Sequence, residues 1–184
     1  MKLVVLDRDG VINHDTGKLV SSPKEFEPID GSLAAIARLN QAGIKVALAI
    51  NQSGIALGLL DIDALHAVHQ RMSQLLQQVR GHIDVIAFCP HSDSNQCSCR
   101  KPSPGLLYSI GERLKIDPAD TVMVGDSLKD VQAAMAAAIQ PALVKTGNGQ
   151  ETLDTNKGLE HIPAYNDLAE FVDELLLSIS ESAE

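Results

Sequence analysis

Five short apolar runs dominate the hydrophobic pattern of the chain. Each is rich in Val, Ile or Leu and lacks the alternation of polar and apolar positions that a half-exposed strand shows. Continuous runs of this length are typical of strands in a parallel sheet that is covered on both faces. We therefore predict strands at 2–7, 45–50, 84–89, 121–126 and 141–147.

Helical patterns lie between and after these runs. Apolar residues in 62–80 recur at the spacing of one helix face. Segment 32–43 opens with Ser32, which can serve as an N-cap, and closes at Gly43. We predict helices at 32–43 and 62–80, from Ser103-Pro104 onward, and at 127–139 and 166–179, with no regular structure in 147–165.

The alternation of strands with helices predicts an α/β fold. Parallel strands joined by right-handed helical crossovers give an open, doubly wound sheet. The intervals between the predicted strands hold little more than a helix each, so we expect a minimal cap domain or none. A length of 184 residues with 45% apolar composition fits one domain over 1–184.

The charge pattern narrows the class of partner. A net charge of −9, with 15 Lys and Arg and no basic run, argues against nucleic acid and anionic membranes. No apolar stretch approaches the ~20 residues of a membrane helix, and the N-terminus does not resemble a signal peptide. We expect a cytoplasmic monomer that binds a small molecule. If that molecule is a phosphate, a cation, a lysine or backbone N–H groups must offset the negative charge locally.

Chemically reactive side chains stand where the predicted strands end. Asp7 and Asp126 end two of them, Asn51-Gln52-Ser53 follows a third, and Cys89 leads from a fourth to Arg100-Lys101. In open α/β sheets, ligands bind outside the carboxyl ends of the strands. We therefore expect these residues to converge on one site.

Two aspartates at one strand end call for a counter-charge. A single aspartate there usually caps a turn, but Asp7 and Asp9 stand only two residues apart. Like charges this close are unfavourable unless a cation or a raised pKa relieves them. Together with Asp126 they offer the hard oxygen ligands that Mg²⁺ prefers, so we predict a magnesium site.

A cysteine cluster suggests a second metal. Cys89, His91, Cys97 and Cys99 lie within eleven residues, and Zn²⁺ takes four such nitrogen and sulfur ligands in structural sites. A buried core cysteine or a redox pair are the alternatives. We predict a closed, structural zinc site in the loop 89–99, which would hold Arg100 and Lys101 in place.

Four motifs, "DRDGVIN", "NQSG", "RKP" and "VGDSLKD", resemble in order and spacing those of the haloacid dehalogenase superfamily of phosphohydrolases. The resemblance implies a Rossmann-like core and a Mg²⁺-dependent phosphatase. It implies that Asp7 is the nucleophile, and that Asp9 protonates the leaving alkoxide and then activates water. The main-chain carbonyl of Asp9 would bind the metal beside Asp7 and Asp126. Lys101 would bring positive charge to the phosphoryl oxygens, and Asp130 would hold Lys101 or metal-bound waters, unless it merely suits a helix N-terminus.

The cysteine loop followed by "RKP" looks like the D-glycero-D-manno-heptose 1,7-bisphosphate 7-phosphatases, which act in nucleotide-activated heptose synthesis for lipopolysaccharide core. The similar histidinol-phosphate phosphatases are the alternative. In the heptose family, Arg100 would contact the distal part of the substrate through its planar fork. The residues that the resemblance assigns to substrate binding are Asp15, Thr16, Gly17, Lys18, Asn51, Gln52, Ser53, Arg100 and Lys101.

Two positions depart from the family pattern. Ile50 stands where a threonine hydroxyl would bind the phosphoryl group, and Leu57 stands where an arginine is familiar. Loss of one such donor costs about 10²–10³ in rate, unless the N–H groups of 51–53 or the Ser53 hydroxyl compensate. The hypotheses are therefore a slowed phosphatase and a sugar-phosphate-binding protein without turnover.

Two histidines of the predicted helix 62–80 are the remaining candidates for metal binding. His66 and His69 are three residues apart and have no third ligand nearby in the sequence. We interpret them as part of a solvated helix face.

Overall fold

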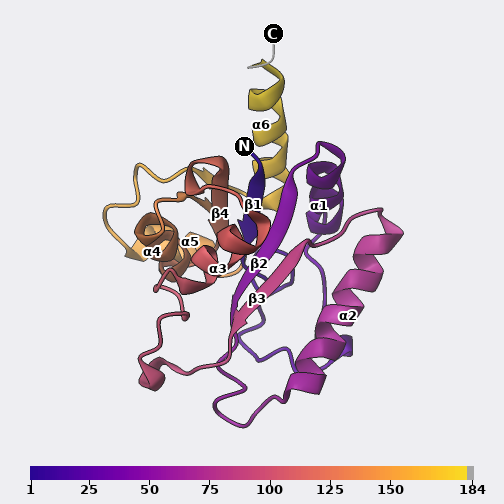
Figure 1. Cartoon of the computed structure of the whole chain (residues 1–184), viewed down its shortest axis with the longest axis vertical. Coiled ribbons are helices and arrows are strands. Elements are labelled where there is room, and N and C mark those ends of the chain that lie inside the picture. The colour runs from indigo at the N-terminus through magenta and orange to yellow at the C-terminus, as the bar shows by residue number, and fades with distance from the viewer. Residues whose placement is uncertain (182–184) are drawn as a thin grey trace.

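Six parallel strands form one sheet in the order β3-β2-β1-β4-β5-β6. The computed structural model describes residues 1–181, and Figure 1 shows their arrangement. This topology confirms the predicted doubly wound α/β fold. The strands are β1 (Leu3–Leu6), β2 (Lys45–Asn51), β3 (Val85–Cys89), β4 (Thr121–Gly125), β5 (Gln140–Val144) and β6 (Ala164–Tyr165).

The helices follow the predicted pattern with one addition. They are α1 (Ser32–Gln41), α2 (Ile62–Gln78), α3 (Gly105–Leu114), α4 (Leu128–Ala136), α5 (Gly149–Thr155) and α6 (Leu168–Glu181). Short 3₁₀ turns lie at Pro23–Glu25, Asp93–Asn95 and Pro118–Asp120. The prediction of no regular structure in 147–165 was wrong, because α5 and β6 both lie there. Each is short, and α5 has too few apolar positions to show a helical period.

The start of α1 differs from the prediction. Gly31, with φ of 82°, is the N-cap residue, and Ser32 is the first helical residue. The Ser32 hydroxyl donates to the carbonyl of Ile12 at 3.0 Å. Ser32 therefore ties α1 to the segment after β1 instead of capping the helix.

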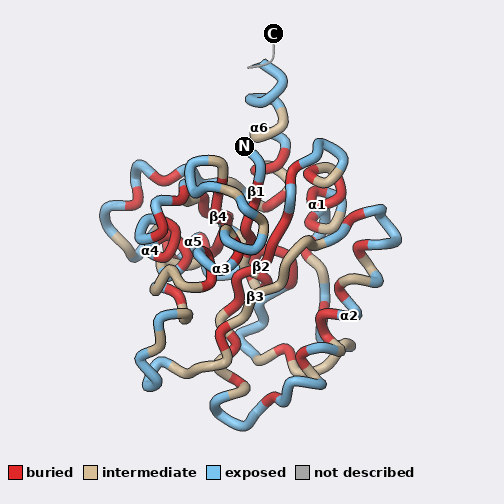
Figure 2. The backbone as a smooth tube through the Cα atoms, in the orientation of Figure 1, coloured by how far each residue is buried: buried red, intermediate tan, exposed pale blue. Residues whose placement is uncertain are grey.

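Alternate residues of each central strand face opposite helical layers. Val4, Leu6 and Leu48 pack with α1, α2 and α6 on one face, whereas Leu3 and Val5 pack with α3 and α4 on the other. Figure 2 shows the buried strands in the middle of the molecule between more exposed helix surfaces. Because both faces are covered, the strands need apolar residues at every position, which explains the continuous runs in the sequence.

The carboxyl ends of the strands all point to one end of the molecule, the lower end in Figure 1. The N-terminus and the end of α6 lie at the opposite end. The sheet order changes direction between β1 and β4, which is where doubly wound sheets open a crevice for ligands. Among the described residues, no helix is long and apolar enough to cross a membrane.

Candidate active site

A cavity of about 200 Å³ lies at the carboxyl ends of β1, β2 and β4. A larger cavity of about 330 Å³ lies near the opposite end of the strands and is mainly apolar. The cavity of about 200 Å³ is the candidate site because four aspartates and three basic side chains line it at the carboxyl ends of the strands. It is lined by Asp7, Asp9, Asp15, Ile50, Asn51, Arg100, Lys101, Asp126, Ser127, Lys129 and Asn148.

Asp7 lies directly after β1 and is fixed from both sides. Its backbone N–H donates to the carbonyl of Val124 at 3.0 Å, which continues the β1–β4 pairing. Its side chain accepts from the backbone N–H of Arg8 at 2.8 Å and forms an ion pair with Lys101 Nζ at 2.8 Å. Burial raises the pKa of Asp7 to about 7 although Lys101 lowers it. A further positive charge near this carboxylate would therefore be stabilising.

Asp126 is held against two glycines at the end of β4. Its Oδ2 accepts from the backbone and the side-chain nitrogen of Asn148 at 2.8 and 3.1 Å. A Cβ added at Gly10 or Gly147 would lie only 2.0 or 2.3 Å from this oxygen. Both glycines also have positive φ, so the carboxylate needs glycine at both positions. Burial raises the pKa of Asp126 to about 6.

Three carboxylates meet in this cavity. Oxygens of Asp7, Asp126 and Asp130 lie within 4.8 Å of one another. Asp130 is already engaged, because it pairs with Lys101 Nζ at 2.6 Å and accepts from the N–H and hydroxyl of Ser127, the N-cap of α4. This buried, oxygen-rich set carries more negative charge than Lys101 offsets, and it suits a hard divalent cation such as Mg²⁺.

Asp9 enters the cavity beside Asp7, but its carboxylate is not part of the three-carboxylate group. Its two oxygens accept from Arg8 Nε at 3.1 Å and Arg8 Nη2 at 2.6 Å, and Asn13 Nδ2 lies 3.2 Å from Oδ1. Arg8 is fully buried. Sequence reasoning did not identify Arg8, although its position between two aspartates was a signal.

The segment after β2 divides into lining and supporting residues. Asn51 lines the cavity and forms two hydrogen bonds with the Lys101 backbone, at 2.9 and 3.0 Å. Gln52 is 2% exposed, and its Oε1 has no hydrogen-bond partner within residues 1–181. Neither Gln52 nor Ser53 is among the lining residues. Ile50 is among them and presents an apolar side chain.

A cationic rim borders the cavity on the side of the cysteine loop. Arg100 Nε lies 2.6 Å from Asp93 Oδ1, and Arg100 Nη1 donates to the carbonyl of His91 at 3.2 Å. Lys129 Nζ lies 3.7 Å from the same Asp93 oxygen. Lys129, at the start of α4, was not anticipated from the sequence. Arg100 and Lys129 thus share one exposed carboxylate that an anionic ligand could replace.

Segment 15–18 contributes only its first residue. Asp15 lines the cavity and accepts from Asn148 Nδ2 at 2.8 Å. Its other oxygen accepts from the N–H of Gly17 at 2.8 Å. Thr16, Gly17 and Lys18 are exposed and lie outside the lining. Asn148 therefore links Asp15 to Asp126 across the cavity.

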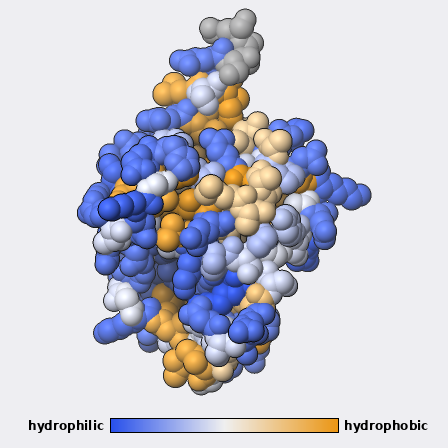
Figure 3. Space-filling model, turned by 90° about the vertical axis from the view of Figure 1, so that its left-hand side faces the viewer, coloured by the Kyte–Doolittle hydropathy of each residue, from blue (hydrophilic) through white to orange (hydrophobic). Residues whose placement is uncertain are grey.

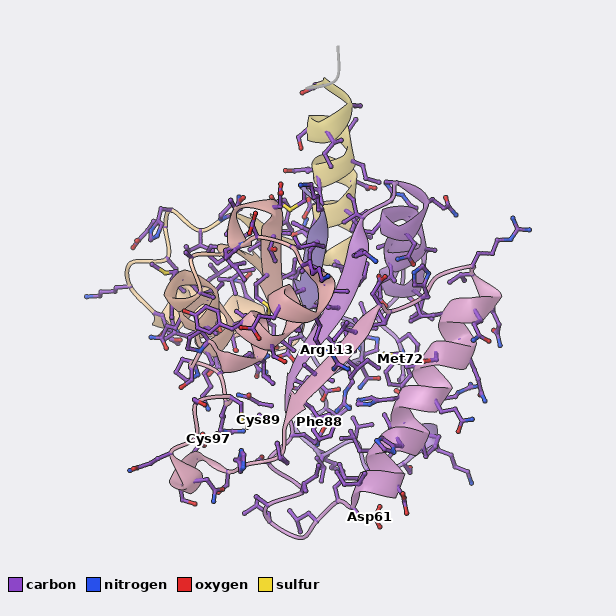
Figure 4. The ribbon with its side chains drawn as sticks, in the orientation of Figure 1. Asp61, Met72, Phe88, Cys89, Cys97 and Arg113 are labelled. Carbon is purple, nitrogen blue, oxygen red and sulfur yellow. The ribbon has the colours of Figure 1, made fainter. Side chains whose placement is uncertain are left out.

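The four cysteine and histidine ligand atoms predicted for zinc converge. Cys99 Sγ lies 3.1 Å from Cys89 Sγ, 3.5 Å from Cys97 Sγ and 3.3 Å from His91 Nδ1. A tetrahedral zinc site with ~2.3 Å bonds separates its sulfurs by roughly 3.8 Å, so the cluster matches a zinc cage with slight expansion. None of the three cysteines is in a disulfide. Figure 4 shows Cys89 at the end of β3 with Cys97 in the loop beyond it.

Apolar residues reach the surface near the site. Leu57 and Leu59, in the loop after β2, are 60% and 66% exposed. On the face shown in Figure 3, several apolar patches interrupt the hydrophilic surface, and one of them lies at the lower end, where the strands terminate. Leu57 stands where the family resemblance implies an arginine, so this loop carries an exposed apolar side chain at that position.

His69 corrects a prediction. Whereas His66 is exposed, His69 is 7% exposed on the face of α2 that also buries Leu65 and Met72. Its Nε2 lies 3.4 Å from Arg8 Nη1. The interpretation of both histidines as solvated was therefore wrong for His69, which lies four residues after Leu65 and so belongs to the apolar stripe.

Comparisons with known proteins agree with the geometry. Residues 98–171 match the HAD-hydrolase-like family. A D-glycero-beta-D-manno-heptose-1,7-bisphosphate 7-phosphatase of Bordetella bronchiseptica is 48% identical over 176 residues, covering 96% of this chain and 98% of the relative. The protein of that name from Pseudomonas putida is 45% identical, covering 96% of this chain and 100% of the relative.

Solved structures give the same result. The crystal structure of the B. bronchiseptica D,D-heptose 1,7-bisphosphate phosphatase complexed with magnesium and phosphate has a TM-score of 0.93 at 47% identity, covering 97% of this chain and 99% of that one. The corresponding phosphatase from Burkholderia thailandensis has a TM-score of 0.75 at 44% identity, covering 96% and 99%. On this similarity over nearly its whole length, the chain belongs to the D-glycero-β-D-manno-heptose 1,7-bisphosphate 7-phosphatase family of haloacid dehalogenase-like hydrolases.

Proposed function

We propose that the chain is a Mg²⁺-dependent phosphatase that removes the 7-phosphate of D-glycero-β-D-manno-heptose 1,7-bisphosphate, in the supply of activated heptose for lipopolysaccharide core. The observation that carries the proposal is the full-length similarity to phosphatases of this name, one of them solved with magnesium and phosphate. The carboxylates and lysine gathered at the strand ends support it independently. One continuous sheet through the described residues supports a single domain over 1–184, with the loop 89–99 as its zinc site.

In the first step, a carboxylate oxygen of Asp7 attacks phosphorus and the bond to the ester oxygen breaks. Asp9 donates its proton to the departing alkoxide. The left-handed turn at Gly10, with φ of 82°, lets two aspartates that are two residues apart face the same cavity. Asp7, Asp126 and the main-chain carbonyl of Asp9 would hold magnesium, which would supply positive charge to the phosphoryl oxygens.

In the second step, Asp9 accepts a proton from water as the water oxygen attacks phosphorus. The bond between phosphorus and Asp7 breaks, inorganic phosphate leaves, and Asp7 is again a carboxylate. Lys101 Nζ lies 2.8 Å from Asp7 Oδ2 in the structure, so its charge is placed to stabilise the oxygens of the transferring group. Asp130 and Asn51 fix the side chain and the backbone of Lys101 respectively.

The rest of the substrate would lie toward the rim. A bisphosphate presents a second anion, and Arg100 and Lys129 already share a carboxylate there. Arg100→Ala should raise KM for heptose bisphosphate far more than for a simple phosphate ester. Equal losses on both substrates would remove Arg100 from substrate recognition.

Phosphate release over a panel of sugar phosphates tests the proposal. The panel contains both anomers of the heptose bisphosphate and histidinol phosphate, with Asp7→Asn as the inactive control. We expect magnesium-dependent release with the β anomer preferred, as the relatives' names indicate. A preference for histidinol phosphate would reject the substrate but keep the mechanism, whereas binding without release would reject the phosphatase.

A further inference from the structure

A buried arginine, Arg8, contacts the carboxylate of Asp9, the proposed proton donor. Arg8 is fully buried, and a buried charge is unfavourable unless it is paired and hydrogen-bonded. Its Nε and Nη2 meet the two oxygens of Asp9 at 3.1 and 2.6 Å. This two-point contact fixes the plane of the carboxylate as well as its position, which a single hydrogen bond cannot do.

The remaining guanidinium nitrogen of Arg8 contacts a residue of helix α2. Arg8 Nη1 lies 3.4 Å from Nε2 of His69, which is buried on α2. A guanidinium can only donate, so His69 must accept through Nε2 and carry its proton on Nδ1. Burial, and then the charge of Arg8, lower the pKa of His69 to about 4, so the ring is neutral at pH 7. The His69 ring also lies 6.5 Å from that of Phe88 on β3.

We propose that Arg8 and His69 are positioning residues that hold Asp9 at the angle needed to pass a proton to the leaving group. The proposal rests on the proposed function, because it needs Asp9 to be the proton donor. Asp9 Oδ2 accepts a single bond within the described residues, from Arg8, so a lone-pair direction remains for the transferred proton. Since His69 comes from α2, the crossover between β2 and β3 becomes part of the catalytic support.

Substrates with different leaving groups distinguish a role of Arg8 and His69 in positioning Asp9 from a role in protein stability alone. An aryl phosphate such as p-nitrophenyl phosphate releases a phenolate that scarcely needs a proton, whereas glycerol phosphate releases an alkoxide that does. The measured quantity is kcat/KM, which reports steps up to phosphoryl transfer to Asp7 and not the later hydrolysis. Variants are Arg8→Gln, His69→Phe and, as the reference for a lost proton donor, Asp9→Asn. The matched control is His66→Phe, on the exposed side of the same helix.

General acid catalysis contributes about 10²–10⁴, so a misplaced donor should lower kcat/KM for glycerol phosphate about tenfold more than for the aryl phosphate. We expect this in Arg8→Gln and His69→Phe, with a larger ratio in Asp9→Asn and none in His66→Phe. Equal losses on both substrates, or no loss, would overturn the proposal. If Arg8→Gln does not fold, His69→Phe decides alone. Both esters are simple phosphates, so the result is independent of whether heptose bisphosphate is the natural substrate.

Discussion

Lys101 forms ion pairs with Asp7 and Asp130, two of the three clustered carboxylates, so the effect of its removal can be calculated. Burial lowers the pKa of Lys101, but Asp130 and Asp7 outweigh this and hold it above its usual value. The substitution Lys101→Met keeps a long, unbranched side chain and removes its charge. Asp130, whose side chain is 1% exposed, would then be a buried carboxylate without its ion-pair partner.

Breaking a buried ion pair by removing one partner costs about 3–5 kcal/mol. We expect Lys101→Met to lower the free energy of unfolding by an amount within this range. Most of the loss should come from the unpaired Asp130, because Asp7 is more accessible, with 19% of its side chain exposed. At a typical urea dependence, the unfolding midpoint should fall by about 1–2 M with little change in slope. Lys129→Met, which removes an exposed lysine from the same cavity, is the control and should change stability by less than about 0.5 kcal/mol.

A second substitution distinguishes the effect on stability from the effect on catalysis. Asp130→Asn keeps an acceptor for Ser127 but removes the buried negative charge. The double variant Lys101→Met/Asp130→Asn should therefore regain most of the lost stability. Phosphate release should stay about 10²–10³ below wild type, because Lys101 then no longer brings its charge to the phosphoryl oxygens. Urea unfolding in magnesium-free buffer and a phosphate assay measure the two effects. A single variant that unfolds at the wild-type midpoint, or a double variant that regains activity, would refute this reasoning.

Three further predictions follow from individual side chains. Ile50→Thr places a hydroxyl in the cavity that Ile50 lines and should raise turnover; equal or lower phosphate release would contradict a missing donor. The unfolded chain protonates His69 at about 6.5 and the folded chain only at about 4, so stability should fall as pH drops through this window, by about 1.4 kcal/mol per pH unit. His69→Phe should remove this pH-dependent contribution to stability. If the urea midpoints of His69→Phe and wild type depended on pH in the same way, this role of His69 would be refuted. Purified protein should contain stoichiometric zinc by mass spectrometry, and Cys97→Ser should lose it and weaken activity indirectly; zinc-free wild type with full activity would rule out the site.

The sequence alone determined the fold class and the centre of the site. Strands buried on both faces must be apolar throughout, so their positions could be read from continuous runs. Because parallel strands end on one edge, Asp7, Asn51, Lys101 and Asp126 had to meet. The close spacing of Cys89 and its three partner residues similarly placed them within reach of one another. These inferences depend on local pattern and on the direction of the strands, which tertiary packing does not alter.

Only the tertiary structure decided which neighbouring side chains join the site. No local pattern distinguishes Asp15 from Lys18, or Asn51 from Ser53, because lining a cavity depends on where distant segments pack. The burial of Arg8 depends on α2 placing His69 against it, and these residues are 61 positions apart. Asn148, which joins Asp126 to Asp15, lies in a stretch with no sequence signal. Long-range packing sets these contacts, and a periodicity or a motif does not contain that information.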